Sequence, residues 1–196
     1  MLNASSPLGP LPPGWSVAHL KSLTSKIGSG ATPKGGAPTY LSERAKYALI
    51  RSQCVHDRWF DQTTISFISD DQANGLRNAA VQAGDILINI TGDGTTFGRA
   101  CIVPDDILPA CVNQHVSIIR ALPSEIDPQF LLSFLTHPDV KPYIESFNAG
   151  GSRRAITKGH IENFEIPLPP LGEQRAIGCL LYTSDAADVG IRVVVG

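Results

Sequence analysis

The sequence predicts an α+β fold: one globular domain with a mixed, largely antiparallel sheet and short helices, followed by the start of a long helix. Its 196 residues are 42% hydrophobic and only 17% charged, which favours one well-buried core and excludes a wholly disordered chain. The 18 glycines and 15 prolines indicate many turns, and therefore short strands rather than a helical bundle. Strand patterns come first and helical patterns later, which is typical of the α+β class.

The strands are expected in the first two thirds of the chain. Residues 1–12 are rich in Pro, Gly and Ser and are predicted to be flexible. The stretch "WSVAHL" indicates a first strand or the start of a helix, with Trp15 anchored in the core. Alternating or continuous apolar runs predict four further strands. These lie within residues 47–54, 86–90, 98–104 and 111–122.

The helices are expected after residue 126. Asp127 is a plausible N-cap, Pro128 suits the first helical position, and "FLLSFL" repeats with helical spacing. A second helix is predicted over Asp139–Asn148, with Val140, Ile144 and Phe147 facing inward and Gly150–Gly151 closing it. The stretch "IENFEIPLPP" predicts a final strand. Another helix should follow in "LGEQRAIGCLL", with Ile177, Leu180 and Leu181 on one side.

Composition also bears on location and partners. No apolar run is long enough to span a membrane, and the N-terminus does not resemble a signal peptide. The four cysteines show no CxxC pairing, so we expect reduced thiols in a cytoplasmic protein and no zinc, although spacing alone leaves a disulfide open. The net charge is −2, yet residues 1–60 hold seven Lys and Arg against two acidic residues. A basic face is one interpretation, and ordinary solvated charge is the other.

The familiar catalytic and nucleotide motifs are missing. "GSGATPKGG" lacks the GK[ST] ending of a phosphate loop, and "GDGTTFG" has Phe97 where a dinucleotide fingerprint needs its third Gly. No histidine pairs with another at metal-ligand spacing, and "LPPL" lacks the flanking residues of a base methyltransferase motif. The pairs Asp70–Asp71 and Asp105–Asp106 could belong to a metal-dependent nuclease, but turn-like surroundings favour a structural role. The sequence therefore predicts no catalysis by this chain alone and no metal site.

The remaining polar groups are of the kinds that contact DNA. Basic and hydroxyl side chains on loops suit phosphates, whereas Asn, Gln and Arg pair with base edges. Each is individually a weak signal, because Asn and Gln on a strand are more often ordinary edge residues. The candidate DNA-binding residues are Thr32, Lys34, Arg51, Thr95, Thr96, Arg99, Asn113, Gln114, His115, Arg153, Arg154 and Lys158.

The order of these segments resembles a known family. "GSGATPKGG", "GDILINITGDGTTFGRA", "VNQHV", "PQFLLSFL", "GGSRRAIT" and "IPLPPLGEQRAI" together are similar to the target-recognition domain of a Type I restriction–modification specificity subunit. The resemblance implies a target-recognition domain over residues 13–168 and the start of a conserved spacer helix over residues 169–181. Glu173, Gln174 and Ile177 of that helix would then contact a methyltransferase subunit.

The resemblance also implies the partners. A full subunit of this family carries two recognition domains, each of which reads half of a split site on double-stranded DNA. Modification subunits use S-adenosylmethionine to methylate adenine after flipping the base, and restriction subunits add ATP-driven translocation and cleavage. This chain would accordingly hold no cofactor itself, because S-adenosylmethionine, ATP and Mg would be bound by its partners. It would pair with a second recognition domain or half-subunit.

Two departures from the family pattern leave alternatives open. Only one recognition domain is present, so a recognition domain split from a fused single-chain enzyme is a second hypothesis, and a stand-alone nuclease is a third. The sequence after "EQRAI" lacks a heptad pattern, and "CLLYTSDAAD" resembles a translated sequencing adapter. We therefore expect residues from about Cys179 onward, and 182–196 in particular, to be a non-native or disordered tail. A genuine C-terminal strand is the alternative.

Overall fold

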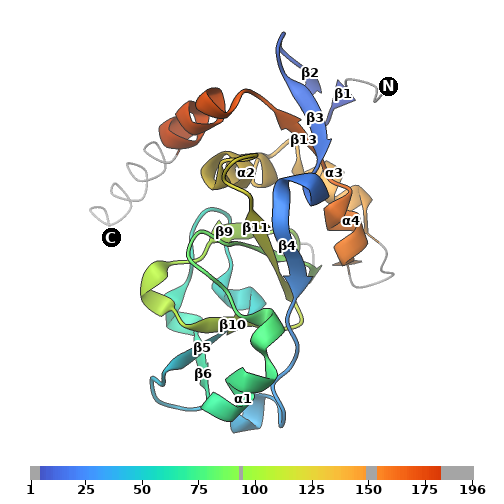
Figure 1. Ribbon diagram of the computed structural model, residues 1–196. Coiled ribbons are helices and arrows are strands. Elements are labelled where there is room, and N and C mark those ends of the chain that lie inside the picture. The colour runs from blue at the N-terminus through green and yellow to red at the C-terminus, as the bar shows by residue number, and fades with distance from the viewer. Residues whose placement is uncertain (1–4, 93–94, 149–153, 182–196) are drawn as a thin grey trace, which may run out of the picture.

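A four-stranded antiparallel sheet forms the centre of the molecule. The structure is a computed structural model, and it describes residues 5–92, 95–148 and 154–181. The central sheet has the order β4 (Thr24–Ser29), β11 (Val116–Ala121), β7 (Ile86–Asn89), β9 (Ala100–Ile102). Figure 1 shows this sheet between an upper group of helices and a lower, smaller sheet.

Both faces of the central sheet are buried, each in its own core. Successive side chains of a strand point to opposite faces, and β7 divides accordingly: Ile86 and Ile88 join the upper core, while Leu87 joins the lower one. This explains why residues 86–89 read as a continuous apolar run rather than as an alternating one.

The lower core is closed by a second sheet. Its order is β10 (Ala110–Val112), β5 (Tyr47–Ile50), β6 (Ser66–Ile68), and β10 pairs with β5 in parallel. Helix α1 (Asp70–Gly75) covers it and begins with a capping box between Ser69 and Gln72. Asp70–Asp71 and Asp105–Asp106 each open a helical turn, where carboxylates are favourable without any metal. The 3-10 helices are η1 (Leu20–Leu23), η2 (Ala37–Thr39), η3 (Ser52–Cys54), η4 (Gln62–Thr64), η5 (Arg77–Ala79) and η6 (Asp105–Ile107).

The upper core is closed by three short helices and by small strand pairs. The helices are α2 (Pro128–Leu135), α3 (Lys141–Ser146) and α4 (Lys158–Glu162). The strand pairs, all antiparallel, are β3 (Ser16–His19) with β13 (Glu165–Leu168), β8 (Thr91–Gly92) with β12 (Arg154–Ala155), and β1 (Ser5–Ser6) with β2 (Gly9–Pro10). Residues 171–181 form a further helix beside α2 (Figure 1).

The α+β prediction is confirmed, and so is the start of α2. The Asp127 carboxylate accepts hydrogen bonds from the backbone N–H groups of Gln129 and Phe130, both at 3.0 Å. The predicted strand over residues 111–122 is wrong in part, because residues 113–115 form a turn between β10 and β11. The last strand begins at Glu165, since Ile161 and Glu162 belong to α4, which the sequence analysis missed.

Other predictions near the ends of the domain need adjustment. The hairpin β1–β2 lies inside the segment expected to be flexible. Trp15 is only half-buried: its ring meets Phe130 edge-on at 6.4 Å, and its Nε1 donates to Glu173 at 3.2 Å. The second helix is shorter than predicted, and its expected closure at Gly150–Gly151 lies outside the described residues, as does the segment 182–196.

The four cysteines are free thiols, and three of them are buried in the lower core. Burial raises the pKa of Cys101 to about 12 and also raises the pKa values of Cys54 and Cys111, because the thiolate is poorly solvated there. We expect iodoacetamide at pH 8 to label exposed Cys179 while these three thiols stay unlabelled until the chain is denatured. Peptide mass spectrometry would check this, and rapid labelling of Cys101 in the folded protein would contradict it.

Within the described residues, no helix is both long and apolar enough to cross a bilayer.

Candidate nucleic-acid interface

Four segments distant in sequence meet at one end of the central sheet. Asn89, the last residue of β7, pairs with Val116, the first of β11, and Ser29 at the end of β4 pairs with Ser117. The smaller sheet joins them there, since the backbone N–H of Asn113 donates to Ile50, the last residue of β5, at 3.0 Å. We call this region the loop end: residues 30–36, 51–60, 91–99 with its gap at 93–94, and 113–115.

Asn89 ties two of these loops together from inside the protein. Its side chain is fully buried, and its Nδ2 donates to the carbonyl oxygens of Ser52 at 2.9 Å and Thr96 at 3.1 Å. A third, longer contact reaches the carbonyl of Val55 at 3.4 Å. Oδ1 has no hydrogen-bond partner among the described residues. One amide group thus fixes the spacing between the 51–60 and 91–99 loops.

The 51–60 loop presents an aromatic and cationic group. The rings of His56 and Trp59 stack with centroids 3.9 Å apart, and Trp59 is 52% exposed. Arg99 approaches from the other loop, with Nη1 3.3 Å from Nδ1 of His56. Arg58 adopts a left-handed backbone (φ 68°), which the bond from its N–H to the carbonyl of Ala100 at 2.8 Å holds in place. An exposed indole beside two arginines is suited to stacking on bases or sugars.

The turn between β10 and β11 carries Gln114 and His115. The Gln114 amide is exposed, and its Nε2 lies 3.1 Å from Nε2 of His115. Nδ1 of His115 lies 2.7 Å from the hydroxyl of Thr91. If Gln114 donates to Nε2, the neutral ring carries its proton on Nδ1 and donates it to Thr91. This chain of contacts holds the turn against β8.

Asn113 has a different role from the one that the sequence suggested. It is 7% exposed, and its Oδ1 accepts from the backbone N–H of His115 at 3.0 Å, which shapes the turn. Its own carbonyl accepts from Gly30 at 3.1 Å. A Cβ on Gly30 would lie 1.7 Å from the carbonyl oxygen of Val112, so only glycine fits there. Asn113 is therefore a buried turn residue, and we remove it from the base-reading candidates.

The first candidates along the chain lie beside this turn. Thr32 and Lys34 are exposed on the loop after Gly30, and the carbonyl of Lys34 accepts from Gln72 of α1 at 3.1 Å. The Arg51 guanidinium lies over the ring of Tyr40, 6.0 Å from its centroid, and donates to the carbonyl of Thr64 at 3.3 Å. Arg51 is thus oriented by two contacts.

The later candidates lie in two regions: some lie at the loop end, and Lys158 lies on α4. Thr95 and Thr96 lie in the turn before Arg99, at the loop end. Arg154 is brought there because β12 pairs with β8, and its guanidinium forms an ion pair with Glu145 at 2.6 Å. Lys158 lies on α4, away from the loop end, and Arg153 is outside the described residues.

The structure also corrects one of the expected partner contacts. Gln174 is 1% exposed; its Oε1 accepts from the N–H of Asp127 at 2.9 Å, and its Nε2 donates to the carbonyl of Pro169 at 2.9 Å. It locks the 171–181 helix onto the start of α2 and is unavailable to a partner. Glu173 is exposed, and Ile177 is partly buried against the upper core.

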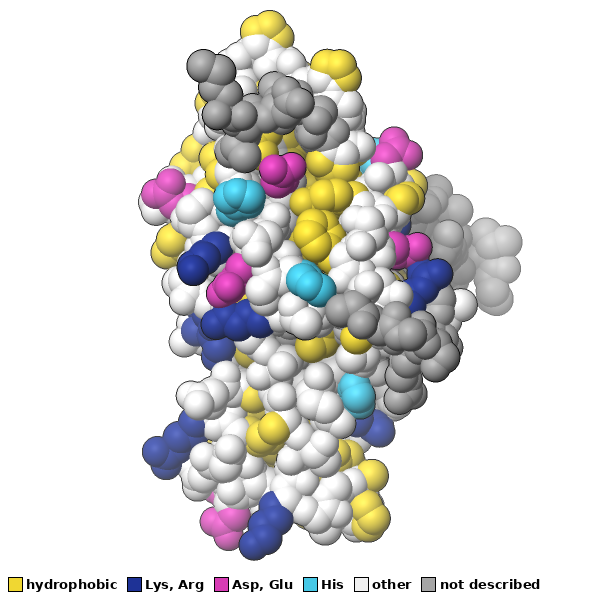
Figure 2. All heavy atoms as spheres, turned by 90° about the vertical axis from the view of Figure 1, so that its right-hand side faces the viewer, with side chains coloured by type: hydrophobic (Ala, Val, Ile, Leu, Met, Phe, Trp, Pro, Cys, Tyr) yellow, Lys and Arg dark blue, Asp and Glu magenta, His cyan; other side chains and the backbone are white. Residues whose placement is uncertain are grey.

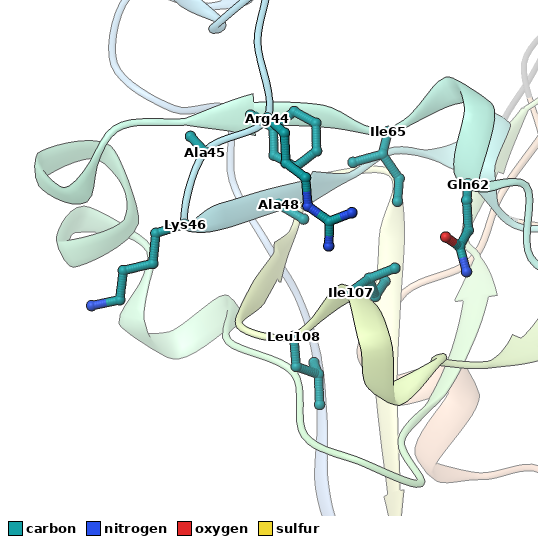
Figure 3. Close-up of a pocket in the computed structure, with 9 residues that line it drawn as sticks. Arg44, Ala45, Lys46, Ala48, Gln62, Ile65, Ile107 and Leu108 are labelled. Carbon is teal, nitrogen blue, oxygen red and sulfur yellow. The ribbon is translucent and has the colours of Figure 1, made fainter.

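A separate hollow lies at the beginning of β5, the opposite end of that strand from Arg51. Its volume is about 240 Å³, and Figure 3 shows the Arg44 guanidinium projecting into it above Ile107. The amide of Gln62 donates to both carboxylate oxygens of Asp106, at 3.2 and 3.1 Å. Because it lies at the start of β5, whereas the loop end follows the last residue of β5, this hollow is separate from the loop end. Among the described residues, no cluster of three or more His, Cys, Asp or Glu could hold a metal ion.

Sequence reasoning missed Asn89, His56, Arg58, Trp59 and Thr91. The stretch "HDRW" offered a signal, since it places a Trp next to an Arg, and both residue types are enriched at interfaces. Asn89 gave none, because its role depends on contacts with Ser52 and Val55, which are distant in sequence.

The fold and the loop end define a class of protein: an α+β module that holds cationic, amide and aromatic side chains on loops at one end of a buried sheet. The sequence identifies the family within that class. The chain belongs to the Type I restriction modification DNA specificity domain family, which it matches over residues 12–189.

Several specificity subunits are similar to this chain in sequence or in fold. The chain is 28% identical over 184 residues to the Type I restriction enzyme MjaVIII specificity subunit of Methanocaldococcus jannaschii, covering 92% of this chain and 41% of that protein. It is 24% identical to the EcoKI specificity subunit of Escherichia coli K12, covering 89% and 37%. The HsdS subunit crystal structure from Thermoanaerobacter tengcongensis has the same fold, with a TM-score of 0.62 and 22% identity over 94% of this chain and 40% of that one. The chain thus spans about two fifths of the length of these relatives.

Proposed function

We propose that this chain reads one half of a bipartite duplex DNA site as a target-recognition domain of a Type I specificity subunit. The observation that carries the proposal is the convergence of Trp59, Arg99, Gln114 and His115 on one end of a rigid sheet. Base-reading residues must be held in register with the groove, and a buried sheet supplies that rigidity. Family membership supports this assignment.

Each group at the loop end has a distinct part in recognition. The exposed amide of Gln114 pairs with an adenine edge in the major groove, and Arg99 with a guanine edge. Thr32, Lys34, Arg51, Thr95, Thr96 and Arg154, with Arg153, contact phosphates and set the register. Arg154 exchanges its ion pair with Glu145 for a phosphate, so its net gain in affinity is smaller than that of an unpaired arginine.

The chemistry belongs to other subunits in this proposal. Modification subunits bind S-adenosylmethionine, and restriction subunits bind ATP and Mg, all in the cytoplasm. The 171–181 helix begins the surface that meets a modification subunit, through exposed Glu173 and the outer edge of Ile177. A second recognition domain completes the split site. The relatives favour neither the fused single-chain hypothesis nor the nuclease hypothesis, because those reported above are specificity subunits.

The test is selection of duplexes from a random pool by the chain together with its methyltransferase partner. We expect one half-site motif to be enriched, with affinity falling steeply as salt rises. Binding that ignores salt and enriches no motif would refute the proposal.

Gln114→Ala should change the preferred base at one position of that motif and leave the other positions intact. Loss of a bidentate base contact reduces discrimination at that position by about 1–3 kcal/mol. Gln82→Ala is the matched control. Gln82 is also an exposed glutamine, but it precedes the first residue of β7, whereas the loop end lies beyond the last residue of that strand. An unchanged motif would remove Gln114 from the reading set.

A further inference from the structure

Exposed aromatic surface is a more specific signal on this protein than charge. Figure 2 shows Lys and Arg side chains mixed with acidic ones over the upper part of the side that carries α3 and α4, so charge by itself marks no binding surface there. Of the large hydrophobic residues that are exposed in the described part of the chain, only Trp59 belongs to the loop end. Tryptophan is enriched among the residues that dominate binding energy.

A short hairpin presents Trp59 to the solvent. Val55 and Phe60 form an antiparallel bridge, and the backbone N–H of His56 donates to the carbonyl of Trp59 at 3.2 Å. Neighbouring side chains of a strand point to opposite faces. Val55 is accordingly buried in the lower core and Phe60 packs against it, whereas His56 and Trp59 lie together on the outer face. The hairpin thus uses one face for the core and leaves the other, with half-exposed Trp59, open.

Contacts from two other elements hold the turn of this hairpin in place. The Asp57 carboxylate accepts from the N–H of Ala100 in β9 at 3.1 Å and from the Lys141 ammonium of α3 at 2.7 Å. The same ammonium donates to the carbonyl of Gly98 at 2.7 Å. The left-handed backbone of Arg58 is one that a non-glycine residue keeps only when its surroundings impose it. A ring on so firmly held a turn has little conformational freedom left to lose when it binds a ligand.

One face of the Trp59 indole is already occupied. The His56 ring covers it, with centroids 3.9 Å apart and an angle of 16° between the planes, and Arg99 contacts that ring from the 91–99 loop. Within the described ranges, no second ring packs on the indole and its Nε1–H has no hydrogen-bond partner. A side chain that wedges between two base pairs contacts a base on each face. This indole is therefore suited to a single flat partner and not to intercalation.

The surroundings favour a nucleic-acid base as that partner. Arg99 lies beside the aromatic pair, and the Asp57 carboxylate is neutralised by Lys141. The 91–99 loop also contacts the turn that carries Gln114, so the indole and the exposed amide belong to one surface. Bases inside an intact duplex are stacked on both faces, and a base offers a free face only after it has left the stack, as in enzymes that extrude a nucleotide.

We propose that the open face of Trp59 stacks on one base of the half-site that is released from the duplex stack, and that His56 holds the indole in position. This inference rests on the proposed function. Every base has a π-face, so the stacking contributes affinity at the opened position and leaves the reading of base edges to other residues.

The decisive variant is Trp59→Ala, measured with the methyltransferase partner on the selected duplex and on a series of duplexes that each lack one base of the half-site. Stacking of a base on an aromatic ring is worth about 1–3 kcal/mol, so the variant should bind the intact selected duplex about 5- to 140-fold more weakly. At one abasic position this loss should disappear, because the sugar and phosphate remain but the stacked base does not. Leu41→Ala, which removes a similarly exposed apolar side chain outside the loop end, should bind every duplex like the unmodified chain.

A cross-linked base pair tests the release of the base. When a covalent cross-link joins the two bases of the pair at that position, neither base can leave the stack, so Trp59→Ala and the unmodified chain should bind this duplex equally. A loss of affinity by Trp59→Ala that persists on the cross-linked duplex would overturn the proposal, because the indole would then contact a stacked base.

His56 is a positioning residue, and its test is rescue. His56→Ala should lose part of the contribution of the same base, and His56→Phe, which keeps a ring against the indole, should restore it. An undiminished contribution in His56→Ala would overturn the positioning role. Repeating the series without the methyltransferase partner identifies the source of the released base: the same single position appears if the chain opens the duplex itself, and only the complex shows it if the partner does. Either result supports the stacking proposal.

Other outcomes separate this proposal from the proposed function. A loss that persists on every abasic duplex indicates a sugar or phosphate contact, and a loss that disappears at two neighbouring positions indicates a wedge. Weaker assembly of Trp59→Ala with the methyltransferase partner in the absence of DNA indicates a protein surface. Each of these overturns the stacking proposal, as does unchanged affinity of Trp59→Ala, while selection of a motif by the unmodified chain keeps the function. If the unmodified chain selects no motif and ignores salt, both proposals fail.

Discussion

Replacing Asn89 with Ala should lower the free energy of unfolding by about 3 kcal/mol and abolish selection of the half-site. The substitution removes the donor for the carbonyls of Ser52, Val55 and Thr96, and a buried carbonyl without a partner costs about 1–3 kcal/mol. Because these carbonyls belong to both loops that carry the Trp59–Arg99 group, the loops should also lose their fixed spacing.

Two further variants sharpen this prediction. Asn89→Asp keeps the size of the side chain but turns an oxygen toward the same three carbonyls, so it should be at least as damaging. Asn74→Ala changes an exposed asparagine of α1 and should alter stability by less than about 0.5 kcal/mol. Urea denaturation and duplex selection measure the two effects. Normal selection by Asn89→Ala would show that the loops hold their positions without the amide.

Phe164→Ala should lower the free energy of unfolding by about 3–5 kcal/mol, as large-to-small changes of fully buried aromatic residues do. The Phe164 ring is completely buried in the upper core, with its centroid 5.2 Å from that of Phe147 and 5.9 Å from that of Tyr143. Its carbonyl accepts from Leu20 at 2.9 Å, so the residue joins the end of α4 to η1.

This position also separates stability from recognition. Phe164→Leu leaves a smaller cavity and should cost about 1–2 kcal/mol. Both variants, studied well below their melting temperatures, should keep the preferred half-site, because Phe164 lies inside the upper core and not at the loop end. Equal stability of Phe164→Ala and the unmodified chain in urea would contradict the packing account, and an altered motif would contradict the placement of recognition.

Local features of the sequence accounted for the elements that were predicted correctly. The Asp127–Pro128 start of α2, the apolar run of β7 and the strand β13, which ends before Pro169–Pro170, are each encoded in a short local stretch. The predictions that were wrong concern stretches in which an apolar strand pattern competes with a side chain that forms a turn or caps a helix. "VNQHV" continued an apolar strand pattern, yet the Asn113 side chain bonds to the N–H of His115 and turns the chain. Thr157 caps α4, and the last two residues of that helix, Ile161 and Glu162, belong to the stretch predicted as a strand.

The candidate site was predictable only in part. Gln114, His115, Arg99 and Arg154 were chosen for their chemistry, and the structure brings them to one end of the sheet. Lys158 had the same chemistry but lies on α4, away from the loop end, and Gln174 proved to be internal. Trp59 and Asn89 were missed because exposure and burial depend on contacts with distant segments, which a pattern of neighbours does not report.

The sequence by itself determined the α+β class, the absence of the familiar catalytic motifs and the family, since these follow from periodicity, residue types and the order of short motifs. Only the tertiary structure decided which polar side chains share a surface. The register of β7 with β11, the parallel pairing of β5 with β10 and the amide of Asn89 bring together segments that are 27 to 62 residues apart. Such long-range contacts depend on packing between strands, and no local stretch of sequence encodes them.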